Sequence, residues 1–524
     1  MEIEVVVMGK SIKIGWGKRS IAKEGLVPIT GQFYLRVAQG SYTPVLVSAL
    51  VIENGSDAVI FVSADMVFVQ PEMLIAAQEI LKKEAPEIPA DKIIVNATHT
   101  HAGPSINKVG GYPCKIKFTG HDEMIEFLSR QLADAVKDAW FSRAEGSIAY
   151  GYGFATTGHS RRTIYLDDTG LREEGKVASG IAVNGHGKMY GNTNDDMFDG
   201  YEAGTDAFIN LLYTFDKDNK VTGAVINVPC PSQTNENAWV MHASFWHNVR
   251  EKLSAKYGEN FGVIGQAAAA GDLSPRQMHY RAAEKRRYLL KYPELIAKYK
   301  SNPMATHYER SPDDNDPGFI YEWMEFMRAE DIANRITAAF DEVLSWAGKE
   351  KFTEPELVHD IRTVKLARRM FPEEMVQAEK SQYDELMKQE YSTDEDPYKE
   401  LIAKSKLTSR RNRLNGVVNR AKIQQEEPGI TTVIHAVKIG NLAFVTNRFE
   451  LFIDFMHRIQ GRSPFEQTVI VQLVTDEYGV GSYLATERAV ANKGYSATPY
   501  CNQVSPQGGQ ELVNETLDML KKLK

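Results

Sequence analysis

Short apolar runs alternate with amphipathic stretches over the first 280 residues of the chain. Residues 45–52 and 58–62 are apolar and β-branched, and the Asn54-Gly55 pair between them is a hairpin signal. Apolar residues at helical spacing predict a helix over residues 72–83. The alternation then continues with predicted strands at 93–97, 224–228 and 262–266, and predicted helices at 122–142 and 242–256. This alternation predicts an α/β fold with mixed β-sheets flanked by helices.

Residues 281–428 differ in character, because they contain long, charged, helix-forming segments such as 319–346 and 373–391. We expect a mainly helical insertion or cap here, carried on an α/β catalytic body formed by residues 1–280 and 429–524. Its basic stretch predicts a solvated helix face, and the alternative is a phosphate or carboxylate clamp at residues 410–413. The body resumes with two strands within residues 431–446, a helix over 450–460 and a strand over 468–474.

The charge balance narrows the range of partners. The chain of 524 residues has 61 Lys and Arg against 69 Asp and Glu, a net charge of −8, so it lacks the basic excess that nucleic acid requires.

The sequence also bears on the compartment. It has no run of about 18 apolar residues, so no membrane span is predicted, and its start lacks the pattern of a signal peptide. Its three cysteines cannot form a disulfide framework. We therefore expect a cytoplasmic protein with a small-molecule substrate; the oligomeric state stays open.

The triplet His99-Thr100-His101 follows the predicted strand at 93–97. In an extended segment, residues two apart point to the same side, so the two imidazoles should converge just past a strand end. Sites of α/β enzymes usually lie there, and imidazole suits zinc. The alternative is a pair of surface-loop histidines.

The segment 265–276 runs from a strand into small residues and then Gly-Asp-Leu-Ser-Pro. Ser274, held by the fixed φ of Pro275, is a candidate nucleophile or hydrogen-bond donor, and the alternative is an ordinary turn beside a sheet. Glu450 lies where a predicted strand becomes a helix. It could bind a metal or handle a proton, or it could only complement the helix dipole. Tyr478 and Tyr483 follow in a Gly-rich loop and could be site residues or packing residues.

Together these segments resemble the neutral/alkaline, non-lysosomal ceramidase family. The matching segments are NATHTHAGPS (96–105), GQAAAAGDLSPR (265–276), IGNLAFVTNRFELF (439–452) and EYGVGSYLATERA (477–489), with further similarity in FVSAD (61–65) and GHSRR (158–162). The resemblance spans about residues 10–510 and is poorest in the helical region 281–428. It implies a neutral-ceramidase-like catalytic body and a zinc-dependent amidase. We expect no C-terminal immunoglobulin-like domain, because the chain stops one helix after Gln510.

Carried over residue by residue, the resemblance implies a zinc site and a set of catalytic groups. His99 would be the first zinc ligand, Glu450 the carboxylate ligand and Tyr483 the phenolic ligand. Ser274 would be the nucleophile or a substrate-orienting hydroxyl, and Asp272 belongs to the same catalytic segment. His101 and Arg161 would contact the substrate or the developing oxyanion.

The second zinc histidine of the family has no counterpart in the sequence, because Pro229-Cys230-Pro231 stands at the end of the corresponding strand. Either the Cys230 thiolate replaces it, or another histidine such as His101, His159 or His242 moves in, or the metal is weak or absent. Three ligands, His99, Glu450 and Tyr483, would meet the count of a catalytic zinc site.

Three hypotheses about function follow. The first is metal-dependent hydrolysis of an amide (N-acyl) bond in a small polar substrate, such as an N-acyl amino compound or a sugar derivative. The second is a carbohydrate-active lyase, dehydratase or glycosidase that uses the same pocket by acid/base chemistry. The third is a binding protein that kept the pocket and lost the metal.

Overall fold

The structure is a computed structural model that describes residues 11–106, 114–172, 183–302 and 313–524. Its centre is a sheet of eight strands, mostly antiparallel, with β13–β14 and β5–β6 as parallel pairs. Across the sheet the order is β14 (Gly262–Ala267), β13 (Val221–Val228), β12 (Phe208–Asp216), β7 (Ala144–Phe154), β1 (Lys13–Ser20), β4 (Leu46–Glu53), β5 (Ala58–Ala64) and β6 (Ile93–Ala97).

A second sheet has four strands and packs face to face against the first. Its order is β16 (Leu357–Ala367), β17 (Gly429–Ile439), β18 (Leu442–Thr446) and β20 (Gln467–Val471), and only β18 and β20 are parallel. The interior between the sheets is apolar, and the rings of Phe61 on β5 and Phe444 on β18 meet there with centroids 4.8 Å apart. Because both faces of β4 and β5 are covered, these strands have the continuous apolar sequences typical of buried strands.

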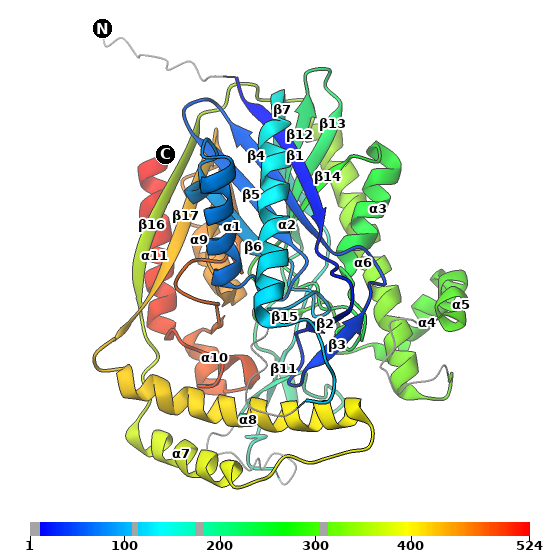
Figure 1. Ribbon diagram of the computed structural model, residues 1–524, viewed down its shortest axis with the longest axis vertical. Helices are drawn as coiled ribbons and strands as arrows, with labels where there is room; N and C mark the ends of the chain where they lie inside the picture. The colour runs from blue at the N-terminus through cyan, green and yellow to red at the C-terminus, as the bar shows by residue number, and fades with distance from the viewer. Residues whose placement is uncertain (1–10, 107–113, 173–182, 303–312) are drawn as a thin grey trace.

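Helices cover the outer face of each sheet, which gives four layers in the order helix, sheet, sheet, helix (Figure 1). The helices α1 (Pro71–Glu84) and α2 (His121–Phe141) pack on β4 and β5. On the other half of the large sheet, α3 (Phe245–Tyr257) and α6 (Pro317–Ala347) pack on β12, β13 and β14. The small sheet is covered by α9 (Ile453–Gln460) and α11 (Pro506–Leu523). The expected α/β fold with mixed sheets is confirmed.

Short elements gather at one end of the two sheets. They are β2 (Leu26–Ile29), β3 (Arg36–Gln39), β8 (His159–Ser160), β9 (Arg162–Tyr165), β10 (Gly187–Met189), β11 (Phe198–Tyr201), β15 (Leu273–Ser274), β19 (Glu450–Leu451), β21 (Tyr483–Leu484), α10 (Glu487–Asn492) and the 3₁₀ turn Tyr495–Ala497. A second 3₁₀ turn, Ala90–Lys92, lies elsewhere in the chain, directly before β6. In Figure 1, α7 (Glu373–Met387) and α8 (Pro397–Ile423) lie across this end.

The region 281–428 contains α4 (Arg281–Lys291), α5 (Pro293–Ser301), α6, α7 and α8, but it also contains β16. That strand pairs along its whole length with β17, so the region is joined to the body through the small sheet. The division into a body and an insertion stays a prediction.

Two predicted boundaries differ from the structure at positions that matter for the site. The helix predicted over 242–256 begins at Phe245, so His242 lies before it. The helix predicted over 450–460 begins at Ile453, and Glu450 instead belongs to the short strand β19. None of the described helices combines the length and apolar composition needed to cross a membrane.

Phe444→Ala tests the packing of the two sheets. The substitution leaves a cavity between them and should lower the free energy of unfolding by about 3–5 kcal/mol. Phe141→Ala is the control, because that ring is 62% exposed at the end of α2 and its loss should cost less than about 0.5 kcal/mol. Urea denaturation followed by circular dichroism measures both. Equal shifts of the two midpoints would contradict this role of Phe444.

Candidate functional site

The candidate site lies where several parallel strands end. His99 follows β6, Gln233 follows β13, Ser274 follows β14 and Glu450 follows β18. Each of these strands has a parallel neighbour, and ligands in open α/β sheets bind at the carboxyl ends of such strands. All four side chains are buried.

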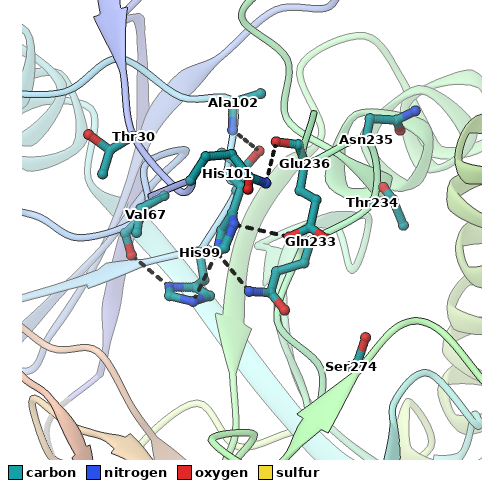
Figure 2. Close-up of polar contacts among 12 residues, drawn as sticks. Thr30, Val67, His99, His101, Ala102, Gln233, Thr234, Asn235, Glu236 and Ser274 are labelled. Carbon is teal, nitrogen blue, oxygen red and sulfur yellow. Dashed lines mark hydrogen bonds and ion pairs between the residues drawn. The ribbon is translucent and has the colours of Figure 1, made fainter. Parts of the chain in front are cut away.

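The two histidines of the triplet do converge, with ring centroids 5.0 Å apart, but not because the segment is extended. His99 has φ 66°, a left-handed conformation that costs energy for a residue with a side chain. Its Nδ1 lies 2.9 Å from the carbonyl oxygen of Val67, and since a carbonyl only accepts, Nδ1 carries the proton. In the neutral ring Nε2 of His99 then has a lone pair, and in the imidazolium ring it carries a second proton. Nε2 of His99 lies 3.4 Å from Oε2 of Glu450. It also lies 3.4 Å from Nε2 of His101 (Figure 2).

Glu450 and Tyr483 are adjacent because β19 and β21 pair in parallel with these two residues in register. Burial alone would raise the pKa of Glu450, but His99, Arg161 and a hydrogen bond with Tyr483 outweigh it and lower the pKa below its usual range. Burial raises the pKa of Tyr483 well above its usual range, against the opposing effect of Arg161. At neutral pH the pair is therefore a carboxylate beside a protonated phenol.

Arg161 connects most of the strand ends. Its guanidinium donates to the carbonyl oxygen of Gly271 at 2.9 Å and to the hydroxyl of Tyr483 at 3.1 Å. It also donates to the hydroxyl of Tyr190 at 3.2 Å and to Oε1 of Gln233 at 3.3 Å. Its Nε–H is buried and has no hydrogen-bond partner among the described residues. The site thus contains one buried N–H donor without an acceptor among the described residues.

Ser274 lies on a different side of the site from the histidines, as Figure 2 shows. Its hydroxyl accepts from the main-chain N–H of Arg276 at 3.2 Å and from the hydroxyl of Tyr190 at 3.4 Å. Within the described parts of the chain, no histidine hydrogen-bonds to it. A serine–histidine pair is therefore not formed in this conformation.

The segment before Ser274 holds Glu450 in place. A Cβ atom on Gly271 would lie 2.3 Å from the carbonyl oxygen of Glu450, so only glycine allows this approach. Asp272 is buried, and its Oδ1 accepts from the N–H of Ile453 at 3.1 Å. Burial raises the pKa of Asp272 to about 7. These contacts tie the strand after β14 to the strand after β18.

Two candidate metal ligands lie in other surroundings. Cys230 is buried in the apolar cluster beneath α3 and α6; its thiol donates to the carbonyl oxygen of Thr157 at 3.2 Å, and burial raises its pKa. His242 uses both ring nitrogens: Nδ1 accepts from the N–H of Ser244 at 3.0 Å, and Nε2 lies 3.1 Å from the carbonyl oxygen of Asn235. Neither side chain has a lone pair directed at His99.

The donor chemistry of the site fits a zinc ion in part. When His99 is neutral, its Nε2 and Oε2 of Glu450 are both acceptors, so their 3.4 Å contact becomes favourable with a second proton on His99 or with a cation between the two atoms. Nitrogen and oxygen ligands at 2.0–2.1 Å in a tetrahedron lie about 3.3–3.4 Å apart. Tyr483 forms a hydrogen bond with Glu450, and its phenolic oxygen would be a third ligand for the metal. However, no group of three His, Cys, Asp or Glu side chains among the described residues has the arrangement of a metal site.

Three residues of the site were missed by the sequence analysis: Tyr190, Gln233 and Glu236. Glu236 lies 3.3 Å from Nδ1 of His101, and Gln233 lies 2.7 Å from its Nε2. Both come from the irregular loop after β13. The position of this loop in the sequence could have indicated them, because it directly follows β13, a strand with a parallel neighbour.

The fold and this site define a class: an α/β protein with two packed mixed sheets and a polar site at the carboxyl ends of their strands. No protein-family model matches the chain, and no curated protein matches it significantly. Solved structures do match. Neutral ceramidase from Pseudomonas aeruginosa is similar with a TM-score of 0.62 and 16% identity, covering 98% of this chain and 74% of that one. A ceramidase complexed with C2 is similar with a TM-score of 0.61 and 16% identity, covering 98% and 75%. At such identities the likeness shows the fold, and the expected neutral-ceramidase-like fold is confirmed.

Asp272→Asn tests the buried carboxyl group. Between about pH 4 and pH 7 the folded chain keeps a proton on Asp272 that the unfolded chain releases, so the stability of the wild type should fall as pH rises through this window. Asparagine does not titrate, so the variant should lack this change in the free energy of unfolding, which is roughly 4 kcal/mol for a shift of about three pKa units. Urea denaturation at several pH values measures the difference between the two proteins. The exposed Asp91→Asn is the control, and a difference that does not change with pH would contradict the assignment.

Proposed function

We propose that this chain is a hydrolase that cleaves an amide (N-acyl) bond in a small polar substrate. The observation that carries the proposal is the 3.4 Å pair of His99 Nε2 and Glu450 Oε2, with the donors of Arg161 beside it. The similarity of the fold to neutral ceramidase supports it, as do the sequence segments that supply these residues.

The proposed cofactor is zinc, held by His99, Glu450 and Tyr483. When bound, zinc would polarise the scissile carbonyl group and lower the pKa of a bound water towards about 7.

The side chains of the protein supply the other parts of the reaction. The unpartnered Nε–H of Arg161 can donate to the carbonyl oxygen as negative charge develops there. Ser274 can act as a nucleophile or orient the substrate, and the hydroxyl of Tyr190 lies within reach of it. His101 presents a lone pair that can accept a proton. The site is buried, so water can be excluded while these charges form.

The polarity of the site supports a small polar substrate. Guanidinium, imidazole, carboxamide, carboxylate and hydroxyl groups meet there, and such groups bind hydrogen-bonding groups in preference to a long acyl chain. An N-acyl amino compound or an N-acylated sugar has such groups around its amide bond. A cytoplasmic location stays a prediction.

A second candidate is a carbohydrate-active enzyme that works by acid/base chemistry without a metal. The observation that favours it is that Gln233, a neutral amide, contacts His101 in the site, while the described residues do not gather three of the usual metal ligands. His101 with Glu236 could then act as a base, and Tyr483 with Arg161 as an acid.

Metal content separates the two candidates. The full chain, incubated with zinc and dialysed, should retain about one zinc ion per chain, since three donors plus a substrate position complete a catalytic site. His99→Ala should lose that ion. His457→Ala is the control, because this histidine is half-exposed and pairs with Asp206 away from the site. Elemental analysis measures all three. Wild type without zinc, combined with chelator-resistant turnover of oligosaccharides, would contradict the amidase and support the second candidate.

Arg161→Lys tests the oxyanion role. Lysine keeps the charge but not the planar array of donors, so kcat for hydrolysis of N-acyl amino acids or N-acetyl sugars should fall about 10²- to 10³-fold with little change in KM. The control is Arg172→Lys, a surface arginine paired with Asp167 and Asp195. A fall in both variants, or in neither, would count against this role.

A further inference from the structure

His101 is enclosed by polar groups that fix its ring from several directions. Gln233 Nε2 lies 2.7 Å from its Nε2, and Glu236 Oε2 lies 3.3 Å from its Nδ1 (Figure 2). Its main-chain carbonyl accepts from the buried guanidinium of Arg36. A Cβ atom on Gly31 would lie 2.5 Å from the Cβ of His101, so the backbone of that turn presses directly on the imidazole.

The hydrogen positions in this network follow from the donors and acceptors alone. Arg161 only donates, so the Gln233 atom that it contacts at 3.3 Å is the amide oxygen. The amide nitrogen of Gln233 therefore faces His101, and as a donor it requires a lone pair on Nε2 of the imidazole. The proton of neutral His101 must then be on Nδ1, which lies 3.3 Å from the carboxylate of Glu236.

Glu236 stays charged because it belongs to a row of alternating charges. Arg276 lies 2.8 Å from it, and Glu325 on α6 lies 3.5 Å from Arg276. Arg328 bonds Glu325, and Glu284 on α4 lies 2.8 Å from Arg328. Burial would raise the pKa of Glu236, but His101 and Arg276 outweigh it and hold the pKa at about 2.

We propose that Glu236 is a positioning residue that places the proton of His101 on Nδ1 and directs the Nε2 lone pair into the site, where Gln233 occupies it until a substrate arrives. The proton assignment stands on the geometry alone. The use of that lone pair in catalysis rests on the proposed function.

The assignment narrows the chemistry of the substrate. A group that replaces Gln233 at Nε2 must donate a hydrogen bond, as an amide N–H, a hydroxyl or an attacking water does. A ligand that offers only acceptors at this point would leave two lone pairs facing each other. Without Glu236 the neutral ring could hold its proton on either nitrogen, and the Nε2–H form would oppose the amide of Gln233 with a second donor.

The tautomer can be read directly by nitrogen NMR of the full chain labelled with ¹⁵N-histidine, with His101→Gln used to assign the His101 signals. Wild type should show a protonated Nδ1 and an unprotonated Nε2. Glu236→Ala should lose this pattern. In Glu236→Gln the amide oxygen can still accept from Nδ1–H, so part of the pattern should return. Glu330→Gln is the control, because it removes a similar carboxylate, paired with Lys252 at 2.6 Å, from α6 without contacting His101.

The spectra decide the assignment whether or not the chain hydrolyses amides. A wild-type His101 protonated on Nε2, or a Glu236→Ala spectrum like that of wild type, would overturn it. For the catalytic part, Glu236→Ala should lower kcat about 10- to 100-fold on substrates that the wild type cleaves, with Glu236→Gln in between. Wild-type kcat in Glu236→Ala, despite the altered tautomer, would overturn the catalytic part alone. Circular dichroism checks that each variant is folded.

Discussion

The buried guanidinium of Arg161 is the interaction on which the candidate site depends. It reaches the segments after β13 and β14 through Gln233 and Gly271, and it reaches β21 through Tyr483. A buried charge is costly unless its donors find acceptors and an opposite charge lies nearby. Glu450, 3.9 Å away, is that opposite charge, so loss of Arg161 would leave a buried carboxylate beside a histidine with no cation. The fold and the site are coupled through this one side chain.

The two-sheet architecture explains why these segments meet. β6 and β14 are the edge strands of the large sheet, yet they meet directly, because Asn96 on β6 donates to the carbonyl oxygen of Gly265 on β14 at 3.0 Å. The small sheet packs on the face of the large one and adds the segment after β18 to the site. Close backbone contacts then fix the loops: Gly271 donates to the carbonyl of Leu451 at 2.8 Å, and Asp272 accepts from Ile453. The Gly-Asp-Leu-Ser-Pro segment therefore has a structural task before any chemical one, because it connects the strand that presents Ser274 to the strand that presents Glu450.

Much of this arrangement could be predicted from the sequence, and the exceptions have physical causes. Strands 93–97 and 262–266 have clear apolar patterns, so the residues after them were found. The left-handed backbone at His99 left no signal, because histidine is rarely in that conformation. β16 was taken for part of a helical region because it is a half-exposed edge strand whose charged residues, as in Leu357–Ala367, interrupt its apolar positions. Gln233 and Glu236 were missed because an irregular loop has no periodicity, and their roles appear only through contacts with Arg161, His101 and Arg276.

The balance of buried charge connects the question of the metal to the question of the substrate. Around the two histidines, four arginines face four glutamates: Arg36, Arg161, Arg276 and Arg328, with Glu236, Glu284, Glu325 and Glu450. This set is neutral as it stands. A dication at His99 and Glu450 would add two positive charges to a buried site, and the field would then favour an ionised Tyr483 and a negatively charged group on the substrate. An acid/base enzyme without a metal needs no such compensation. A zinc amidase on this scaffold should therefore prefer anionic N-acyl compounds, whereas a metal-free enzyme should accept neutral sugars equally well.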